Sequence, residues 1–152
     1  MEKVLISACL LGENCKYNGG NNFNEAAAAL AERFELVPVC PEVLGGLSVP
    51  RPPCERKQLE EGSWCVLSND PEGLMDVTKA FTRGAAKCLK IARENDINLA
   101  VLKSRSPSCG SGEIYDGTFS HTVVSGDGVT AELLKKNGIK IINEYDIQKP
   151  QP

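Results

Sequence analysis

Short apolar runs alternate with stretches of helical character along most of this 152-residue chain, and this alternation constrains its fold more than any other feature. The apolar runs predict strands at residues 3–8, 36–39, 99–102 and 139–142. The stretches between them predict helices at residues 25–33, 77–94 and 130–137. Such an order is typical of the α/β class, and it predicts a single three-layer Rossmann-like domain with a mainly parallel sheet of about four to five strands. Because no linker divides the chain, residues 1–148 are expected to form this one domain and residues 149–152 a frayed tail.

Individual residues set the expected ends of these elements. Asn24 and Asp76 stand before helical stretches, where their side chains accept the first free amides. Gly138 follows the last helical stretch and is expected to end it in the left-handed conformation. Pro38 lacks an amide hydrogen, so its strand is expected at an edge of the sheet.

Two long segments have no regular pattern. Residues 41–53 contain two glycines and four prolines and are expected to form a loop, which at this length is usually functional. The stretch that follows the third strand is irregular as far as Gly128 and is a candidate lid.

Four of the seven cysteines follow expected strands. Cys9 and Cys15 come after the first, Cys40 after the second and Cys109 after the third. Since the carboxyl ends of parallel strands meet at one sheet edge, we expect these thiols to gather there as a reactive or metal-binding site. An odd number of cysteines also excludes complete internal disulfide pairing.

The spacing of the four thiols favours an iron–sulfur cluster over zinc. Structural zinc sites usually contain Cys-x2-4-Cys pairs, which this chain lacks, and His121 is the only histidine. The alternative is that the four cysteines are small buried apolar residues. Cys88 fits that role on its helix, and Cys54 and Cys65 are interpreted as structural or incidental.

Glu42 and Arg51 are the charged candidates near these cysteines. Glu42 lies two residues after Cys40 beside a glycine-rich loop, where a carboxylate is able to exchange protons. Arg51 is flanked by prolines and is expected either to anchor an anionic or carbonyl group or to form a salt bridge on the rim. The remaining loop carboxylates are interpreted as solvated: Glu55, Asp70 and Glu113.

Ser106 and Ser108 flank Pro107 just before Cys109. Their hydroxyls, with the amides of Gly110 to Gly112, are expected to form a concave nest of donors or simply a turn. A serine hydrolase is excluded because no G-x-S-x-G elbow is present, and a cysteine protease is disfavoured because only His121 is available as the base. Phosphate-binding glycine motifs are also absent.

The composition of the chain bears on whether nucleic acids or membranes are binding partners. A net charge of -3 and 5% aromatic residues predict no extended nucleic-acid surface. The apolar run near the N-terminus is too short for a signal peptide or a membrane span, so we expect a cytoplasmic protein without a membrane partner.

Several short motifs, taken together, resemble the bacterial thiouracil desulfidase family. They are Ser7-Ala8-Cys9-Leu10-Leu11-Gly12, Cys15-Lys16-Tyr17, Val39-Cys40-Pro41-Glu42, Gly45-Gly46-Leu47, Pro50-Arg51 and Ser106-Pro107-Ser108-Cys109-Gly110. The resemblance spans almost the whole chain, including all four strand-end cysteines.

This resemblance implies a [4Fe-4S] cluster held by three cysteines, with one open iron that takes the sulfur of a thiolated pyrimidine. It implies Cys9, Cys15 and Cys109 as preferred ligands, with Cys40 the least certain of the four. The implied reaction is non-redox desulfuration of a small thioamide or thiolated nucleobase, with Glu42 as the catalytic carboxylate. Ser106 or Ser108 would supply the catalytic hydroxyl. The alternatives are a cluster- or metal-binding redox or sulfur sensor without turnover, and a thiol-regulated domain with no metal.

Overall fold

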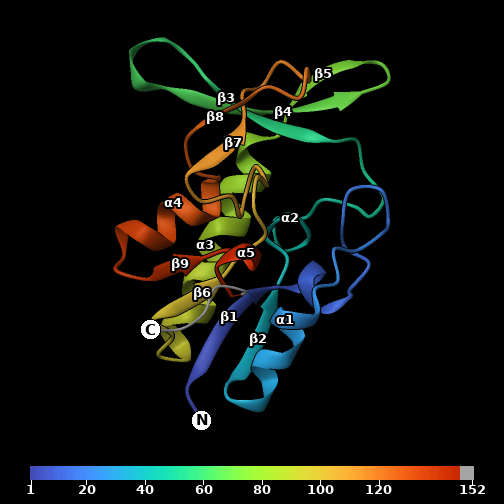
Figure 1. The fold of residues 1–152 in the computed structure, drawn as a ribbon. Coiled ribbons are helices and arrows are strands. Elements are labelled where there is room, and N and C mark those ends of the chain that lie inside the picture. The colour runs from blue at the N-terminus through green and yellow to red at the C-terminus, as the bar shows by residue number, and fades with distance from the viewer. Residues whose placement is uncertain (148–152) are drawn as a thin grey trace.

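The computed structural model describes residues 1–147, and the tail expected at 149–152 lies outside them. A four-stranded sheet in the order β2-β1-β6-β9 forms its lower half, and every pairing in it is parallel (Figure 1). Its strands are β1 (Lys3–Ser7), β2 (Glu35–Val39), β6 (Leu99–Val101) and β9 (Lys140–Ile142). The predicted α/β class and the parallel sheet are therefore confirmed, and the strand with Pro38 is at an edge as expected.

Helices pack against both faces of this sheet because successive strand side chains point to opposite faces. Leu5 packs in a core with residues of α3 (Thr78–Glu94) and α4 (Val129–Lys136). Val4 and Ile6 pack in a second core with residues of α1 (Glu25–Ala29) and of α5 (Glu144–Ile147). None of the helices that the structure describes is long and apolar enough to cross a membrane.

The predicted helix ends agree closely with the structure. Asn24 Oδ1 accepts the amide of Ala27 at 2.9 Å and begins α1. Asp76 Oδ1 accepts the amide of Thr78 at 2.9 Å, although α3 starts one residue later than predicted. Gly138 has a φ of 81° after α4, as expected for a left-handed end. The first helix is shorter than predicted, because a 3-10 turn continues it from Leu30 to Glu32.

The upper half of the molecule was not predicted from the sequence. It contains an antiparallel sheet of β3 (Cys54–Gln58), β4 (Trp64–Asp70) and β5 (Gly73–Asp76), and a hairpin of β7 (Glu113–Tyr115) and β8 (Val123–Ser125). The prediction of an irregular segment before Gly128 is wrong where β7 and β8 pair. These strands carry many polar residues, so they lack the apolar runs by which the parallel strands are recognised.

The expectation of a loop at residues 41–53 is wrong in its first part, where Pro41–Leu44 form the helix α2. Proline suits the first position of a helix, because its missing amide hydrogen has no partner there. Helix α2 crosses α3 with backbone against backbone. A Cβ at Gly45 would lie 2.0 Å from the carbonyl oxygen of Ala80, and a Cβ at Gly84 would lie 1.9 Å from that of Pro41. Two glycines therefore fix α2 at the end of the parallel sheet.

Candidate active site

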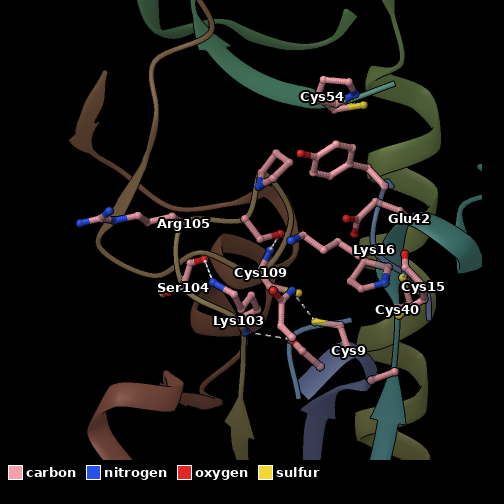
Figure 2. A pocket seen from close by; sticks show the side chains of 18 of the residues that line it. Cys9, Cys15, Lys16, Cys40, Glu42, Cys54, Lys103, Ser104, Arg105 and Cys109 are labelled. Atoms are coloured by element: carbon pink, nitrogen blue, oxygen red, sulfur yellow. Dashed lines mark hydrogen bonds between the residues drawn. The ribbon is translucent and has the colours of Figure 1, made fainter. Parts of the chain in front are cut away.

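A cavity of about 490 Å³ separates the parallel sheet from the upper strands, and the four strand-end cysteines line it (Figure 2). Cys9 lies in a 3-10 turn directly after β1, and Cys40 is the residue before α2. Cys15 is in the loop after β1, which turns back through Gly12 with a φ of 92°. Cys109 is in the loop after β6. The structure thus brings together the four thiols that the sequence singled out.

Each thiol has a distinct environment. Burial raises the pKa of Cys9, which accepts a hydrogen bond from Asn22 Nδ2 at 3.4 Å. Burial also raises the pKa of Cys109 well above its usual range. A hydrogen bond between the thiols of Cys15 and Cys40 raises the pKa of Cys15 and lowers that of Cys40. Cys15 and Cys40 are therefore direct neighbours in the cavity wall.

The carboxylate of Glu42 is held from two sides. Its Oε1 accepts a 2.5 Å hydrogen bond from Ser108 Oγ, and its Oε2 lies 3.4 Å from Arg51 Nη2. The side chains of Glu42 and Arg51 are 14% and 6% exposed. Arg51 also donates to the carbonyl oxygens of Ser48 and Cys15. Arg51 does form an ion pair, but the expectation that this pair lies on the rim is wrong, because it is buried in the cavity wall.

The two candidate serines occupy different positions. Ser106 lines the cavity, and its Oγ accepts the amides of Ser108 and Cys109 at 3.2 and 3.0 Å. Ser108 is fully buried, with its Oγ 3.0 Å from Ser106 Oγ. Two amides of the expected donor nest are engaged within the protein, because Gly110 donates to the carbonyl oxygen of Ser106 and Gly112 donates to Asp127 Oδ1. Ser106, Ser108 and Glu42 form one hydrogen-bonded chain.

Three further residues of the cavity wall were not identified from the sequence: Lys103, Cys54 and Glu55. Lys103 lies 3.2 Å from Glu144, which is 5% exposed and also accepts the amide of Ser104. Cys54, interpreted as incidental, lines the cavity as well. Glu55 was interpreted as solvated, which is wrong: it is 9% exposed, lines the cavity and accepts two backbone amides. No local motif in the sequence marks these residues, and their place in the cavity wall appears only in the folded molecule.

Of the other two carboxylates interpreted as solvated, Glu113 is exposed and pairs with Arg105 across the surface. Asp70 ends β4 and accepts the amide of Glu72 in the turn to β5. Cys88 is buried in the core against the parallel sheet, as expected. Cys65 is half-buried on β4 and is not part of the cavity wall.

Comparisons with known proteins agree on one family. The family model of 2-thiouracil desulfurase matches residues 4–146. The chain is 41% identical over 149 residues to the uncharacterized protein YbbK of Bacillus subtilis (strain 168), which covers 95% of this chain and 97% of YbbK. It is also similar to the solved structure of the [4Fe-4S]-dependent thiouracil desulfidase TudS, with a TM-score of 0.84 and 40% identity over 96% of this chain and 93% of that one. The chain therefore belongs to the 2-thiouracil desulfurase family.

Proposed function

We propose that this protein is a [4Fe-4S]-dependent enzyme that converts thiouracil, or a related thiolated pyrimidine base or nucleoside, to uracil and sulfide. The observation that carries this proposal is one cavity lined by Cys9, Cys15, Cys40, Cys109 and Glu42 in a chain of this family. Its volume of about 490 Å³ is in the range typical of small-molecule sites, which supports a small thioamide as the substrate. A Rossmann-like three-layer domain of residues 1–148 is the matching fold assignment, supported by helices on both faces of the parallel sheet.

The donor set of the cavity fits an iron–sulfur cluster. In the part of the chain that the structure describes, no three His, Cys, Asp or Glu side chains converge on one point suited to a single metal ion. Thiols spread over a cavity wall suit a cluster instead, because each thiolate then binds a different iron. We assign Cys9, Cys15 and Cys109 as the ligands and Cys40 as the alternative to its neighbour Cys15. When bound, the cluster supplies an open iron that polarises the thiocarbonyl group as a Lewis acid.

The hydrogen-bonded chain gives each catalytic group a role. Ser106 Oγ accepts two amides, so its own hydrogen is directed to Ser108 Oγ. Ser108 in turn donates its hydrogen to Glu42 Oε1. Ser108 is too deeply buried to contact a substrate, and the hydrogen and both lone pairs of Ser106 Oγ are already engaged, so the two serines act by fixing the orientation of Glu42. Glu42 takes the proton of the attacking water, a step that typically contributes about 100- to 10,000-fold in rate.

Arg51 completes this arrangement. Three of its N–H groups hold Ser48, Cys15 and Glu42, so it fixes the carboxylate relative to the cysteine loop. Its other two N–H groups, on Nε and Nη1, have no acceptor among residues 1–147, and Arg51 lines the cavity. We assign them to the carbonyl oxygen of the substrate.

Anaerobic reconstitution with iron and sulfide tests the proposal. We expect a brown protein with broad absorbance at about 400 nm and about four irons per chain, which releases sulfide from 2-thiouracil. Cys109→Ala is expected to lose both the cluster and the activity, whereas Cys65→Ala, outside the cavity wall, keeps both. Glu42→Gln is expected to keep the cluster and lose at least about 100-fold in rate. A colourless chain that binds one zinc, or full activity in Glu42→Gln, contradicts the proposal.

A further inference from the structure

We propose that Glu55 is a substrate-recognition residue, whose free carboxylate oxygen accepts a hydrogen bond from an N–H or O–H group of the ligand while its other oxygen holds the loop that closes the cavity. The identity of the ligand as a thiolated pyrimidine base or nucleoside rests on the function proposed above.

One oxygen of Glu55 is fully engaged by the loop between β7 and β8. Its Oε1 accepts the amide of Gly117 at 3.0 Å and that of Phe119 at 3.1 Å. Gly117 has a φ of 96° and lies so close to β3 that a Cβ there would be 2.5 Å from the Cβ of Lys57. Tyr115 and His121, on either side of this segment, line the cavity. Glu55 therefore fastens to β3 the loop that forms this wall.

The other oxygen, Oε2, accepts no hydrogen bond and forms no ion pair with any residue in the range 1–147. It is nevertheless not sealed in the protein. Within this range, the hydroxyl of Thr130 is the one side-chain oxygen that is both inaccessible and unpartnered. Because Glu55 is 9% exposed and lines the cavity, the unpaired oxygen is left to the cavity. Once a ligand fills the cavity and excludes water, a carboxylate oxygen buried to this degree requires a donor from that ligand.

The position of Glu55 suits recognition of the ligand away from the sulfur atom. Figure 2 shows Cys54, its neighbour on β3, across the cavity from Cys9, with Glu42 between the two. A ligand whose sulfur faces the cysteines thus presents another edge to β3. In 2-thiouracil the two N–H donors flank the thiocarbonyl carbon and point to the sides of the ring, whereas in 4-thiouracil N1–H lies opposite the sulfur. In a nucleoside the ribose adds hydroxyl donors. A carboxylate accepts from either and offers no donor to a carbonyl oxygen.

Two substitutions separate recognition from the support of the loop. In Glu55→Gln, the amide oxygen replaces Oε1 as acceptor for Gly117 and Phe119, whereas the amide nitrogen presents donors to the cavity. Glu55→Ala removes both functions. Amide hydrogen exchange of Gly117 and Phe119 is expected to stay slow in Glu55→Gln and to become fast in Glu55→Ala. Glu113→Gln, an exposed carboxylate on the same hairpin, is the matched control.

The binding experiment uses anaerobic, cluster-reconstituted protein and calorimetry with 2-thiouracil, its 1-methyl and 3-methyl derivatives, 2-thiouridine and 2′-deoxy-2-thiouridine. We expect Glu55→Gln to weaken binding of 2-thiouracil roughly 10- to 100-fold, the usual effect of losing a hydrogen bond to a charged group, and Glu113→Gln to have no effect. If a base N–H is the donor, one methyl derivative binds the wild type more weakly but is not further weakened by Glu55→Gln. If a ribose hydroxyl is the donor, the same pattern appears for the deoxy compound. Either pattern supports the proposal.

The proposal is overturned if Glu55→Gln binds every ligand as the wild type does, since a purely structural carboxylate predicts that result. It is also overturned if the substitution weakens all ligands equally. Sulfide release is measured in parallel. A wild type that shows the Glu55-dependent binding pattern but releases no sulfide refutes the desulfidase proposal and leaves the recognition by Glu55 standing.

Discussion

Gly84→Ala is the sharpest test of how the fold positions Glu42. On local grounds this substitution stabilises α3, because alanine is better than glycine in a helix interior by roughly 0.5–1 kcal/mol. The structure predicts the opposite sign. The new Cβ would lie 1.9 Å from the carbonyl oxygen of Pro41, whereas real contacts of this kind are not shorter than 3.0 Å, so α2 has to move by roughly 1 Å. Overpacking of this kind costs about 1–3 kcal/mol, and because the obstacle is backbone rather than a flexible side chain, we expect the upper end.

The net expected loss is about 2 kcal/mol, equivalent to a fall in Tm of roughly 4–8 °C for a chain of this size. Urea and thermal unfolding measure it. Thr82→Ala, at an exposed position of the same helix, is the control and should be neutral or slightly stabilising. Because α2 carries Glu42, Gly84→Ala is also expected to reduce sulfide release in molecules that remain folded. A Gly84→Ala variant as stable as Thr82→Ala would show that the backbone crossing of α2 and α3 does not fix the site.

Two further predictions concern groups outside the hydrogen-bonded chain of Ser106, Ser108 and Glu42. Burial raises the pKa of Cys88 to about 12, so its thiol is neutral in the folded protein and should resist iodoacetamide at pH 8 until the protein unfolds. The raised pKa contributes to the free energy of unfolding below pH 9, and this contribution is expected to fall as the pH rises toward 12. Urea titrations that compare the wild type with Cys88→Ala at several pH values measure it. Glu144→Gln should lower the free energy of unfolding by about 1–3 kcal/mol, because Lys103 loses its buried carboxylate partner. The double variant with Lys103→Met should recover part of this loss, and no recovery would contradict the coupling of the pair.

The lower half of the molecule is predictable because short apolar runs in the sequence mark its strands. An apolar run such as Val4–Leu5–Ile6 has only one common use in a chain of this size, a strand buried on both faces. Once the strands are parallel, topology alone places Cys9, Cys40 and Cys109 at the same edge of the sheet. The convergence of the strand-end thiols could therefore be predicted without knowing any side-chain contact.

The upper half is not predictable in this way because long-range polar contacts hold it together. β3 reads Cys-Glu-Arg-Lys-Gln, which resembles an exposed strand or a loop. In the structure Arg56 stacks on Trp64 at 4.1 Å and donates to the carbonyl oxygen of Asp127 at 2.8 Å. Arg56 also pairs with Glu132 on α4. Partners separated by 71 and 76 positions leave no periodic signal in the sequence, so the burial of Glu55 and Arg56 appears only in the folded molecule.

The two walls of the cavity are held in different ways, and this difference affects how the site selects its ligand. The cysteines and Glu42 are held by the parallel sheet and by α2, whose positions follow from apolar packing and from Gly45 and Gly84. In the opposite wall, Glu55 fastens the loop between β7 and β8 to β3, and the contacts of Arg56 hold β3 itself. A substitution at Glu55 leaves the four strand-end thiols and the hydrogen-bonded chain in place, because neither of these includes a residue of β3. Glu55 and the groups assigned to the reaction therefore lie on separate elements, and substitutions at Glu55 should alter which thiolated compound binds without altering how its sulfur is removed.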